Sequence, residues 1–382
     1  MQLTRSYWRC PACGQTCAPA DTAWELPPGN ASWGVRAAAA LVGALVPSFA
    51  QAADLLATLT PIQVSARALE TFTEAVGDAY ILPDPPATPP TPDLLVIQCD
   101  GGMVHMRPAH WQEVKGMLVY RREDGVDQPP RHAVVQGPWA DHDDVLLALA
   151  APEGLGRARE ILCLADGARP IWNLLDRLFP DAFQLLDWYH LLQHLDAVAA
   201  RLPDGATWQD AQATALWERG PQETLRALIG LLRQSDLPAD IRDAVRSCFI
   251  YLWHNRARVD YAEARQRGYP CGSGRIESAI KTVVQARAKG PGMRWNPPHL
   301  QRVLNARCAV LNGDFALACA QAKTAALAPP RPPSGVPSLR PQVARPYLNT
   351  APHAPRRVAT ARPAGVSQQE AARIIRGAFA LG

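Results

Sequence analysis

The chain has 382 residues, of which 48% are hydrophobic and 19% are charged, and its formal net charge is +4 at pH 7. This length and composition predict a soluble globular protein of two or three domains. The longest apolar run, Ala37–Val46, falls well short of the roughly 18–20 residues of a membrane span, which excludes an integral membrane protein. The sequence begins without a charged and then apolar leader, and its nine Cys are scattered. We therefore expect reduced thiols and a cytoplasmic location.

Residues 1–30 contain a Cys-x-x-Cys knuckle formed by Cys10 and Cys13. Such a knuckle is half of a zinc ribbon, which needs four ligands in a tetrahedron. No second knuckle follows at ribbon spacing, although Cys17 could supply a third ligand. The segment is therefore interpreted as partially zinc-ribbon-like, with Cys10 and Cys13 as candidate Zn²⁺ ligands.

Residues 32–78 are predicted to form two helices. Apolar residues recur at helical spacing from Val46 to Leu59, Thr60-Pro61 breaks the run, and Ser65 is placed to cap the second helix. Two helices across a tight turn could be a helix-turn-helix that reads a DNA groove. They could equally be a small bundle that only packs.

The stretch Pro83–Pro92 has six prolines in ten residues and predicts a stiff linker. Alternating strand-like and helix-like runs follow it, with three continuous apolar strands typical of a covered sheet. The predicted elements are strands over Leu94–Cys99, Val114–Arg121 and Arg131–Gln136, a helix from Asp141, a strand over Ile161–Leu164, a helix over Ile171–Leu178 and a strand over Phe183–Leu186.

The pattern from Leu191 to about Arg267 is purely helical. It fills most of the 111 residues that separate Asp166 from Glu277. A gap of this length is too long for a simple connection within a compact domain, so we expect an inserted helical domain here.

Three carboxylates are the candidate catalytic residues. Asp100 and Asp166 each end an apolar strand, and Glu277 opens a helix-like segment after Gly272-Ser273-Gly274. Carboxylate oxygens are ligands that Mg²⁺ prefers, and two such ions clamp the attacking and leaving oxygens of a phosphodiester displacement. The plainer interpretations are Asp-Gly turns after each strand and, for Glu277, a helix-dipole partner or an ion pair with Lys281.

Further residues are expected around this site. Asp187 and His190 follow the last strand, where His190 could position a phosphate, shuttle a proton or simply bond the strand end. Arg107 is placed on the second strand, where it contacts phosphate or forms a surface ion pair. Lys281, Arg287, Lys289 and Arg294 follow Glu277 and would hold the DNA backbone, with a solvated basic face as the alternative.

Four ordered segments, Asp100–Arg107, Ala165–Ala168, Leu186–His190 and Gly268–Ser278, resemble the DDE transposases of bacterial insertion sequences, in particular the ISKra-type group. The resemblance runs from about Tyr7 to about Leu311. It implies an α/β, ribonuclease-H-like catalytic domain with a mixed sheet, interrupted by an all-helical insertion. It also implies Mg²⁺ or Mn²⁺ held by Asp100, Asp166 and Glu277, and DNA as substrate. A second Cys pair is expected upstream of the Cys10 knuckle in that group.

The resulting hypothesis is a DNA transposase that cuts element ends and joins the 3′-hydroxyl to target DNA, acts as a dimer or larger assembly, and associates with the nucleoid. The alternatives are a structure-selective nuclease and a non-catalytic DNA-binding remnant. The last segment, residues 321–382, has nine Lys or Arg against one acid and ten prolines, and is expected to be a disordered basic tail. The predicted segments are 1–30 ribbon-like, 31–80 helical, 81–93 linker, 94–190 catalytic core, 191–267 helical insertion, 268–320 final core helix and 321–382 tail.

Overall fold

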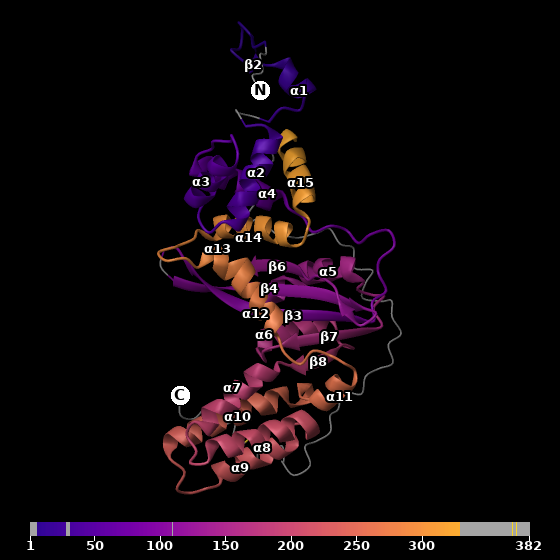
Figure 1. Cartoon of the computed structure of the whole chain (residues 1–382), viewed down its shortest axis with the longest axis vertical. Coiled ribbons are helices and arrows are strands. Elements are labelled where there is room, and N and C mark those ends of the chain that lie inside the picture. The colour runs from indigo at the N-terminus through magenta and orange to yellow at the C-terminus, as the bar shows by residue number, and fades with distance from the viewer. Residues whose placement is uncertain (1–5, 28–30, 109, 329–368, 370–371, 373–382) are drawn as a thin grey trace.

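A computed structural model describes residues 6–27, 31–108, 110–328, 369 and 372, and it shows a mixed α/β fold (Figure 1). A six-stranded sheet lies at its centre, in the order β5-β4-β3-β7-β8 with β6 also paired to β4. Strands β7 and β8 continue the sheet from β3 in parallel, whereas β4 is antiparallel to β3, β5 and β6. The strands are β3 Leu94–Met106, β4 His110–Glu123, β5 Val126–Asp127, β6 Arg131–Gln136, β7 Glu160–Ala165 and β8 Phe183–Leu186.

The core of the molecule lies on both faces of this sheet. Residues 94–99 of β3 are all buried, although successive side chains of a strand point to opposite faces. Helices α5 (Asp143–Ala150), α6 (Arg169–Leu178), α12 (Gly274–Ala279) and α14 (Pro297–Leu311) pack against the strands. The continuous apolar run of β3 therefore reflects its central, doubly covered position, as the sequence predicted.

The first strand is longer than predicted. We expected it to end at Cys99, but β3 continues through Asp100 to Met106 and pairs residue for residue with β4, from Leu94↔Arg122 to Met106↔His110. The prediction that Arg107 lies on the second strand is therefore wrong, because it follows β3 directly. Strands β6 and β8 have the predicted bounds, and the short strand β5 was not predicted.

The N-terminal part has a two-stranded hairpin, β1 (Trp8–Arg9) with β2 (Thr16–Cys17), then α1 (Pro19–Ala23) and three longer helices. The prediction of two helices over 32–78 is wrong, because α2 (Trp33–Leu45), α3 (Phe49–Leu59) and α4 (Ala66–Ala79) form instead. Each has a serine N-cap: Ser32, Ser48 and Ser65 accept hydrogen bonds from the amides of Val35, Gln51 and Ala68. Ser65 caps its helix as predicted.

Helices α2–α4 are fastened to α14 and to the segment before it. Helix α4 packs so closely on α14 that a Cβ added at Gly77 would lie 1.7 Å from the carbonyl oxygen of Arg302. Two buried guanidinium groups complete the junction. Arg287 donates to the carbonyls of Gly43 and Pro47, and Arg307 donates to those of Ala44 and Leu45, so both satisfy carbonyls at the C-terminal end of α2.

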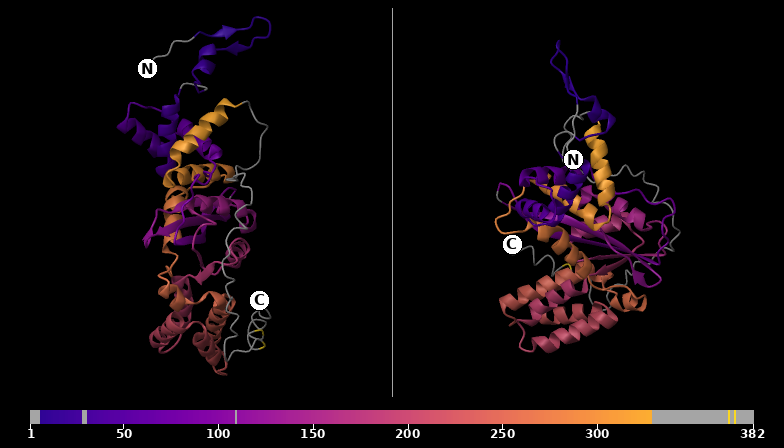
Figure 2. Two further views of the ribbon diagram at one scale, coloured as in Figure 1. Left: turned by 90° about the vertical axis from the view of Figure 1, so that its right-hand side faces the viewer. Right: turned by 45° about the horizontal axis from the view of Figure 1, so that its top comes forward.

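The region predicted as purely helical is helical in the structure. It contains α7 (Trp188–Ala199), α8 (Gly205–Arg219), α9 (Gln222–Leu232), α10 (Ala239–Asn255) and α11 (Tyr261–Gln266). These helices lie at the opposite end of the molecule from α2–α4, with the sheet between them (Figure 1), and Figure 2 shows the same arrangement from the side. Chain order then leads to α12, which carries Glu277.

A π-helical segment, η4 (Ile280–Gln285), and the short helix α13 (Ala286–Ala288) connect α12 to α14. Residues 315–327 form helix α15 (Phe315–Leu327), so the predicted tail overlaps a helix at its start. The rest of that prediction falls almost entirely outside the described residues. Among the helices that the structure describes, none is both long and apolar enough to span a membrane.

Candidate functional site

Asp100 and Asp166 lie side by side on neighbouring parallel strands. Their preceding residues, Cys99 of β3 and Ala165 of β7, are paired directly in the sheet. Asp100 is itself within β3, and Asp166 is the first residue after β7. The expectation that these strands are neighbours is therefore confirmed, and it brings the two carboxylates together.

Asp187 adds a third acidic residue beside the same edge. It caps α7 directly after β8, and its amide donates to the carbonyl of Ala165 at 2.8 Å. Its fully buried carboxylate accepts hydrogen bonds from the amide of His190 at 2.6 Å, from His190 Nδ1 at 3.1 Å and from the amide of Ser273. Burial alone would raise the pKa of Asp187, but these hydrogen bonds outweigh it and hold that pKa below its ordinary value.

Glu277 reaches the cluster from α12. Ser273 Oγ donates to Glu277 Oε1 at 3.3 Å, and the amide of Ile276 donates to the buried side chain of Gln98 at 3.1 Å, which fastens α12 to β3. One ligand atom from each of Asp187, His190 and Glu277 lies within 4.8 Å of the other two. Helix α12, which follows the helical segment in the chain, thus lies beside β3, the strand that carries Asp100.

The carboxylates of the site influence one another electrostatically. The pKa of Asp100 is raised to about 6, chiefly by burial and also by the charges of Asp166 and Glu277, against the Gly101 amide and His190, which lower it. The hydrogen bond to Asp187 raises the pKa of His190, and the charges of Asp166 and Glu277 add to this effect. The site therefore gathers the negative charge of several carboxylates beside a single histidine. A bound cation would relieve the remaining repulsion.

Tyr251 holds the backbone of this site from the helical segment. Its hydroxyl donates to the carbonyl of Asp166 at 2.6 Å. The next residue, Gly167, has φ +98°, and an added Cβ there would lie 2.7 Å from the Tyr251 ring. Gly167 is thus required both by its conformation and by this close approach. Sequence reasoning missed Tyr251, because it sits mid-helix with no local motif.

The predicted DNA-binding cations are not all in one place. Arg107, Arg287 and Arg294 line a single pocket, whereas Lys281 is exposed on η4 and Lys289 lies over the ring of Trp111. Arg287 differs from the exposed cation that we expected. It is 1% exposed and donates to the carbonyls at the end of α2, so it is part of the helix junction.

The Cys-x-x-Cys knuckle forms the turn between β1 and β2. The amide of Cys10 donates to the carbonyl of Gln15, and the amide of Gly14 donates to that of Cys10. Cys10, Cys13 and Cys17 are all exposed, and hydrogen bonds from Cys13 lower the pKa of the Cys10 thiol. Thiolate character favours a soft metal, but the knuckle supplies only part of a four-ligand set.

No protein-family model matches this chain, and a search of curated proteins found no match.

Proposed function

We propose that the chain is a DNA transposase of an insertion sequence, which cuts element ends and joins the freed 3′-hydroxyl to target DNA. The observation that carries the proposal is that Asp166, after β7, and Glu277, on α12, lie near enough to Asp100 of β3 for their charges to raise its pKa. Their motifs resemble those of the ISKra-type DDE transposases, and the mixed sheet suits a ribonuclease-H-like core interrupted by a helical insertion. The relationship to the ISKra-type group, the ribonuclease-H-like fold and the transposase activity are all parts of this proposal.

The three carboxylates would hold Mg²⁺ or Mn²⁺. They offer only oxygen donors, which suits hard divalent ions, and the raised pKa of Asp100 indicates a site poised for added positive charge. When bound, a pair of such ions stabilises the attacking and leaving oxygens of a phosphodiester displacement. Zn²⁺ at Cys10 and Cys13 is a separate proposal, which needs two further ligands to complete a tetrahedral set.

The remaining residues position this chemistry. Asp187 fixes the ring of His190 through Nδ1, and the raised pKa of His190 favours its protonated form, which would attract a phosphate near the carboxylates. Tyr251 holds the backbone at Asp166, and Gln98 holds α12 against β3. These residues act by orientation, which is the main protein contribution in phosphoryl transfer.

DNA is the proposed partner, both as element ends and as target. Exposed Arg107, Lys281, Lys289 and Arg294 would contact its backbone. Helices α2–α4 remain candidates for DNA recognition. We propose a dimer or larger assembly in the DNA complex, because two element ends must be handled together.

The test is metal-dependent cleavage of DNA that contains the element's own ends. We expect cleavage with Mg²⁺ or Mn²⁺ by the wild type, and loss of cleavage with retained DNA binding in Asp100→Asn, Asp166→Asn and Glu277→Gln. Asp84→Asn, an exposed carboxylate outside the cluster, is the matched control. Near wild-type cleavage by any of the three variants would remove that residue from the site.

Strand transfer separates the transposase from a structure-selective nuclease. Pre-cleaved ends with a free 3′-hydroxyl should become joined to a second DNA in the transposase, and only cut products should form in a nuclease. A folded, DNA-binding wild type without any cleavage would identify a non-catalytic remnant.

A further inference from the structure

A basic pocket lies at the junction of α3, the end of β3 and the connection between α13 and α14. Its volume is about 370 Å³. Among its lining residues are four arginines and one glutamate: Arg67, Arg107, Arg287, Arg294 and Glu70. Glu70 is already paired with Arg67 at 2.7 Å. The lining therefore carries a surplus of positive charge with no free carboxylate to balance it.

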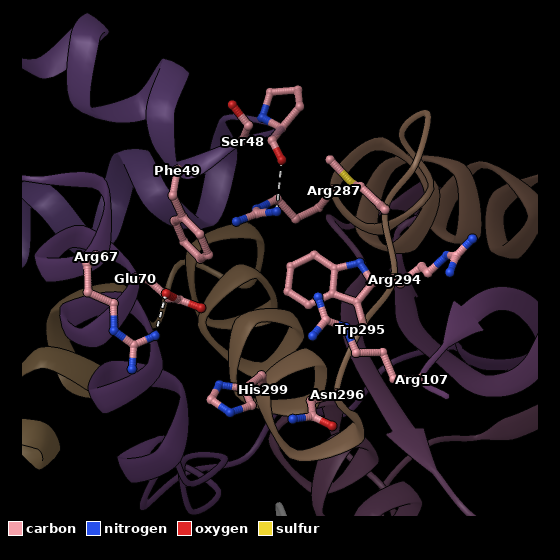
Figure 3. Close-up of a pocket in the computed structure, with 12 residues that line it drawn as sticks. Ser48, Phe49, Arg67, Glu70, Arg107, Arg287, Arg294, Trp295, Asn296 and His299 are labelled. Carbon is pink, nitrogen blue, oxygen red and sulfur yellow. Dashed lines mark hydrogen bonds and ion pairs between the residues drawn. The ribbon is translucent and has the colours of Figure 1, made fainter. Parts of the chain in front are cut away.

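Arg287 is the central group of this pocket. Its guanidinium carbon lies 4.4 Å from the Phe49 ring centroid and 5.3 Å from that of Trp295, so it is held between two rings (Figure 3). Nε and Nη1 donate to the carbonyls of Gly43 and Pro47, whereas the buried Nη2 has no hydrogen-bond partner in the described part of the chain. A buried donor without a partner is costly, and an anion is the natural acceptor for it.

Arg287 remains a charged group despite its burial. Desolvation, with a smaller effect from Arg307, lowers its pKa to about 10, which still leaves it protonated at neutral pH. Its side chain is ion-paired to no carboxylate among the residues that the structure describes. The charge of Glu70 offsets that of Arg287 in part, but Glu70 is itself paired with Arg67, so an incoming anion would be stabilised here more than at the open surface.

Two exposed arginines flank the opening. Arg107 follows β3, and Arg294 precedes Trp295, whose backbone pairs with that of His105 and Arg107. Neither side chain forms a hydrogen bond or an ion pair with any residue that the structure describes, so both remain available to a ligand. The N-terminus of the 11-residue helix α3, at Ser48 and Phe49, borders the same pocket and adds partial positive charge.

We propose that this pocket binds a phosphate group of a DNA strand, as an anchoring point separate from the carboxylate cluster. The proposal rests on the proposed function, since it takes DNA as the partner. Arg107 lies seven residues beyond Asp100 along β3, which corresponds to roughly 23 Å at about 3.3 Å per residue. At about 3.4 Å per nucleotide, the anchored phosphate would lie about seven nucleotides from the scissile one.

The test removes the two exposed arginines and leaves Arg287 intact, because Arg287 also holds the end of α2. Binding of a labelled DNA duplex is measured in EDTA at several salt concentrations for the wild type, Arg107→Gln/Arg294→Gln and a charge-matched control. The control is Arg201→Gln/Arg226→Gln, which removes two exposed cations from the helical segment. EDTA removes any requirement for catalysis, so failure of the transposase chemistry would not affect the result.

We expect the pocket variant to bind about five- to tenfold more weakly per lost contact at about 0.1 M salt, with a slope of log K against log salt shallower by about 2. The control should retain the wild-type slope. A pocket variant that matches the control in both affinity and slope would overturn the proposal.

A second arm distinguishes DNA from a free phosphate. The thermal midpoint of the wild type and the pocket variant is measured with inorganic phosphate and with a deoxynucleoside monophosphate. Stabilisation of the wild type alone, together with an unchanged DNA salt slope in the variant, would assign the pocket to a free phosphate ligand and overturn the DNA source. A shallower dependence of DNA affinity on salt in the variant, with no stabilisation of the wild type by the free compounds, would support binding of a phosphate within a DNA strand.

Discussion

The hydroxyl of Tyr251 donates a 2.6 Å hydrogen bond to the main-chain carbonyl of Asp166, although 85 residues separate the two in the chain. This bond ties helix α10 of the helical segment to the strand end that carries a proposed metal ligand. The long helical segment is therefore attached to the candidate site by a specific contact, and its position bears directly on the geometry of Asp166.

Tyr251→Phe should lower the free energy of unfolding by about 1–3 kcal/mol, because it leaves the Asp166 carbonyl without this donor. It should also reduce cleavage while leaving DNA binding intact, since the backbone at Asp166 loses a support. Urea unfolding and a cleavage assay measure the two effects. Tyr189→Phe is the matched control, because the Tyr189 hydroxyl has no hydrogen-bond partner among the described residues. Equal behaviour of the two variants would rule out the positioning role of Tyr251.

Gly77→Ala and Gly230→Ala should change stability in opposite directions, although both glycines are within helices. A Cβ at position 77 would lie 1.7 Å from the carbonyl oxygen of Arg302, so α4 and α14 would have to move apart. Overpacking of this kind costs about 1–3 kcal/mol or more. Position 230 has nothing within 4 Å, so alanine there should stabilise α9 by about 0.5–1 kcal/mol. Chemical denaturation of both variants checks the contrast, and a stabilised Gly77→Ala variant would contradict the close packing of α4 on α14.

Asp100→Asn should stabilise the protein in EDTA at pH 7, by on the order of 1–3 kcal/mol. The pKa of Asp100 is raised from 3.8 to about 6, so its charged form is disfavoured in the folded state. The wild type therefore loses stability as pH rises from about 4 to about 6, and the advantage of the variant should vanish as pH falls through that window. Thermal denaturation across this range measures the effect. Mg²⁺ should raise the thermal midpoint of the wild type and not that of the variant, and an equal Mg²⁺ response in both would exclude Asp100 as a ligand.

His190 should stabilise the folded state at low pH and lose this contribution at high pH. Its hydrogen bond to Asp187 raises its pKa above 6.5, so the stabilisation is complete below 6.5 and disappears as pH rises through the raised value. We expect the stability difference between the wild type and His190→Gln to shrink above neutral pH. Denaturant unfolding in EDTA from pH 5 to pH 9 provides the measurement. A difference that stays constant over this range would show that the protonated pair does not contribute.

Much of the sheet could be predicted from local pattern. Strand β8 has the predicted bounds because an apolar run ends sharply at Asp187. The prediction ended strand β3 too early, because Asp100-Gly101-Gly102 has the composition of a turn. In the structure, antiparallel pairing with β4 continues the strand through these residues. Tertiary pairing outweighed the local signal.

The parts of the site that depend on distant contacts could not be predicted. Nothing around Gln98 indicates that its side chain accepts from the amide of Ile276, 178 residues later. The burial of Arg287 could not be predicted either, because its carbonyl partners, Gly43 in α2 and Pro47 just after it, lie more than 200 residues earlier. The carboxylates themselves could be proposed from local sequence, because Asp100 and Asp166 each follow an apolar run and Glu277 follows Gly272-Ser273-Gly274.

The two buried guanidinium groups at the end of α2 affect how the proline-rich stretch 81–93 should be interpreted. A segment of this composition is usually a spacer whose length sets the reach between two mobile modules. Here hydrogen bonds from Arg287 and Arg307 join the end of α2 to the segment α13–α14, and Gly77 of α4 packs closely against α14. The length of the proline-rich stretch therefore does not set the distance between α3 and the carboxylates. Lengthening the stretch would enlarge a loop and leave that distance unchanged.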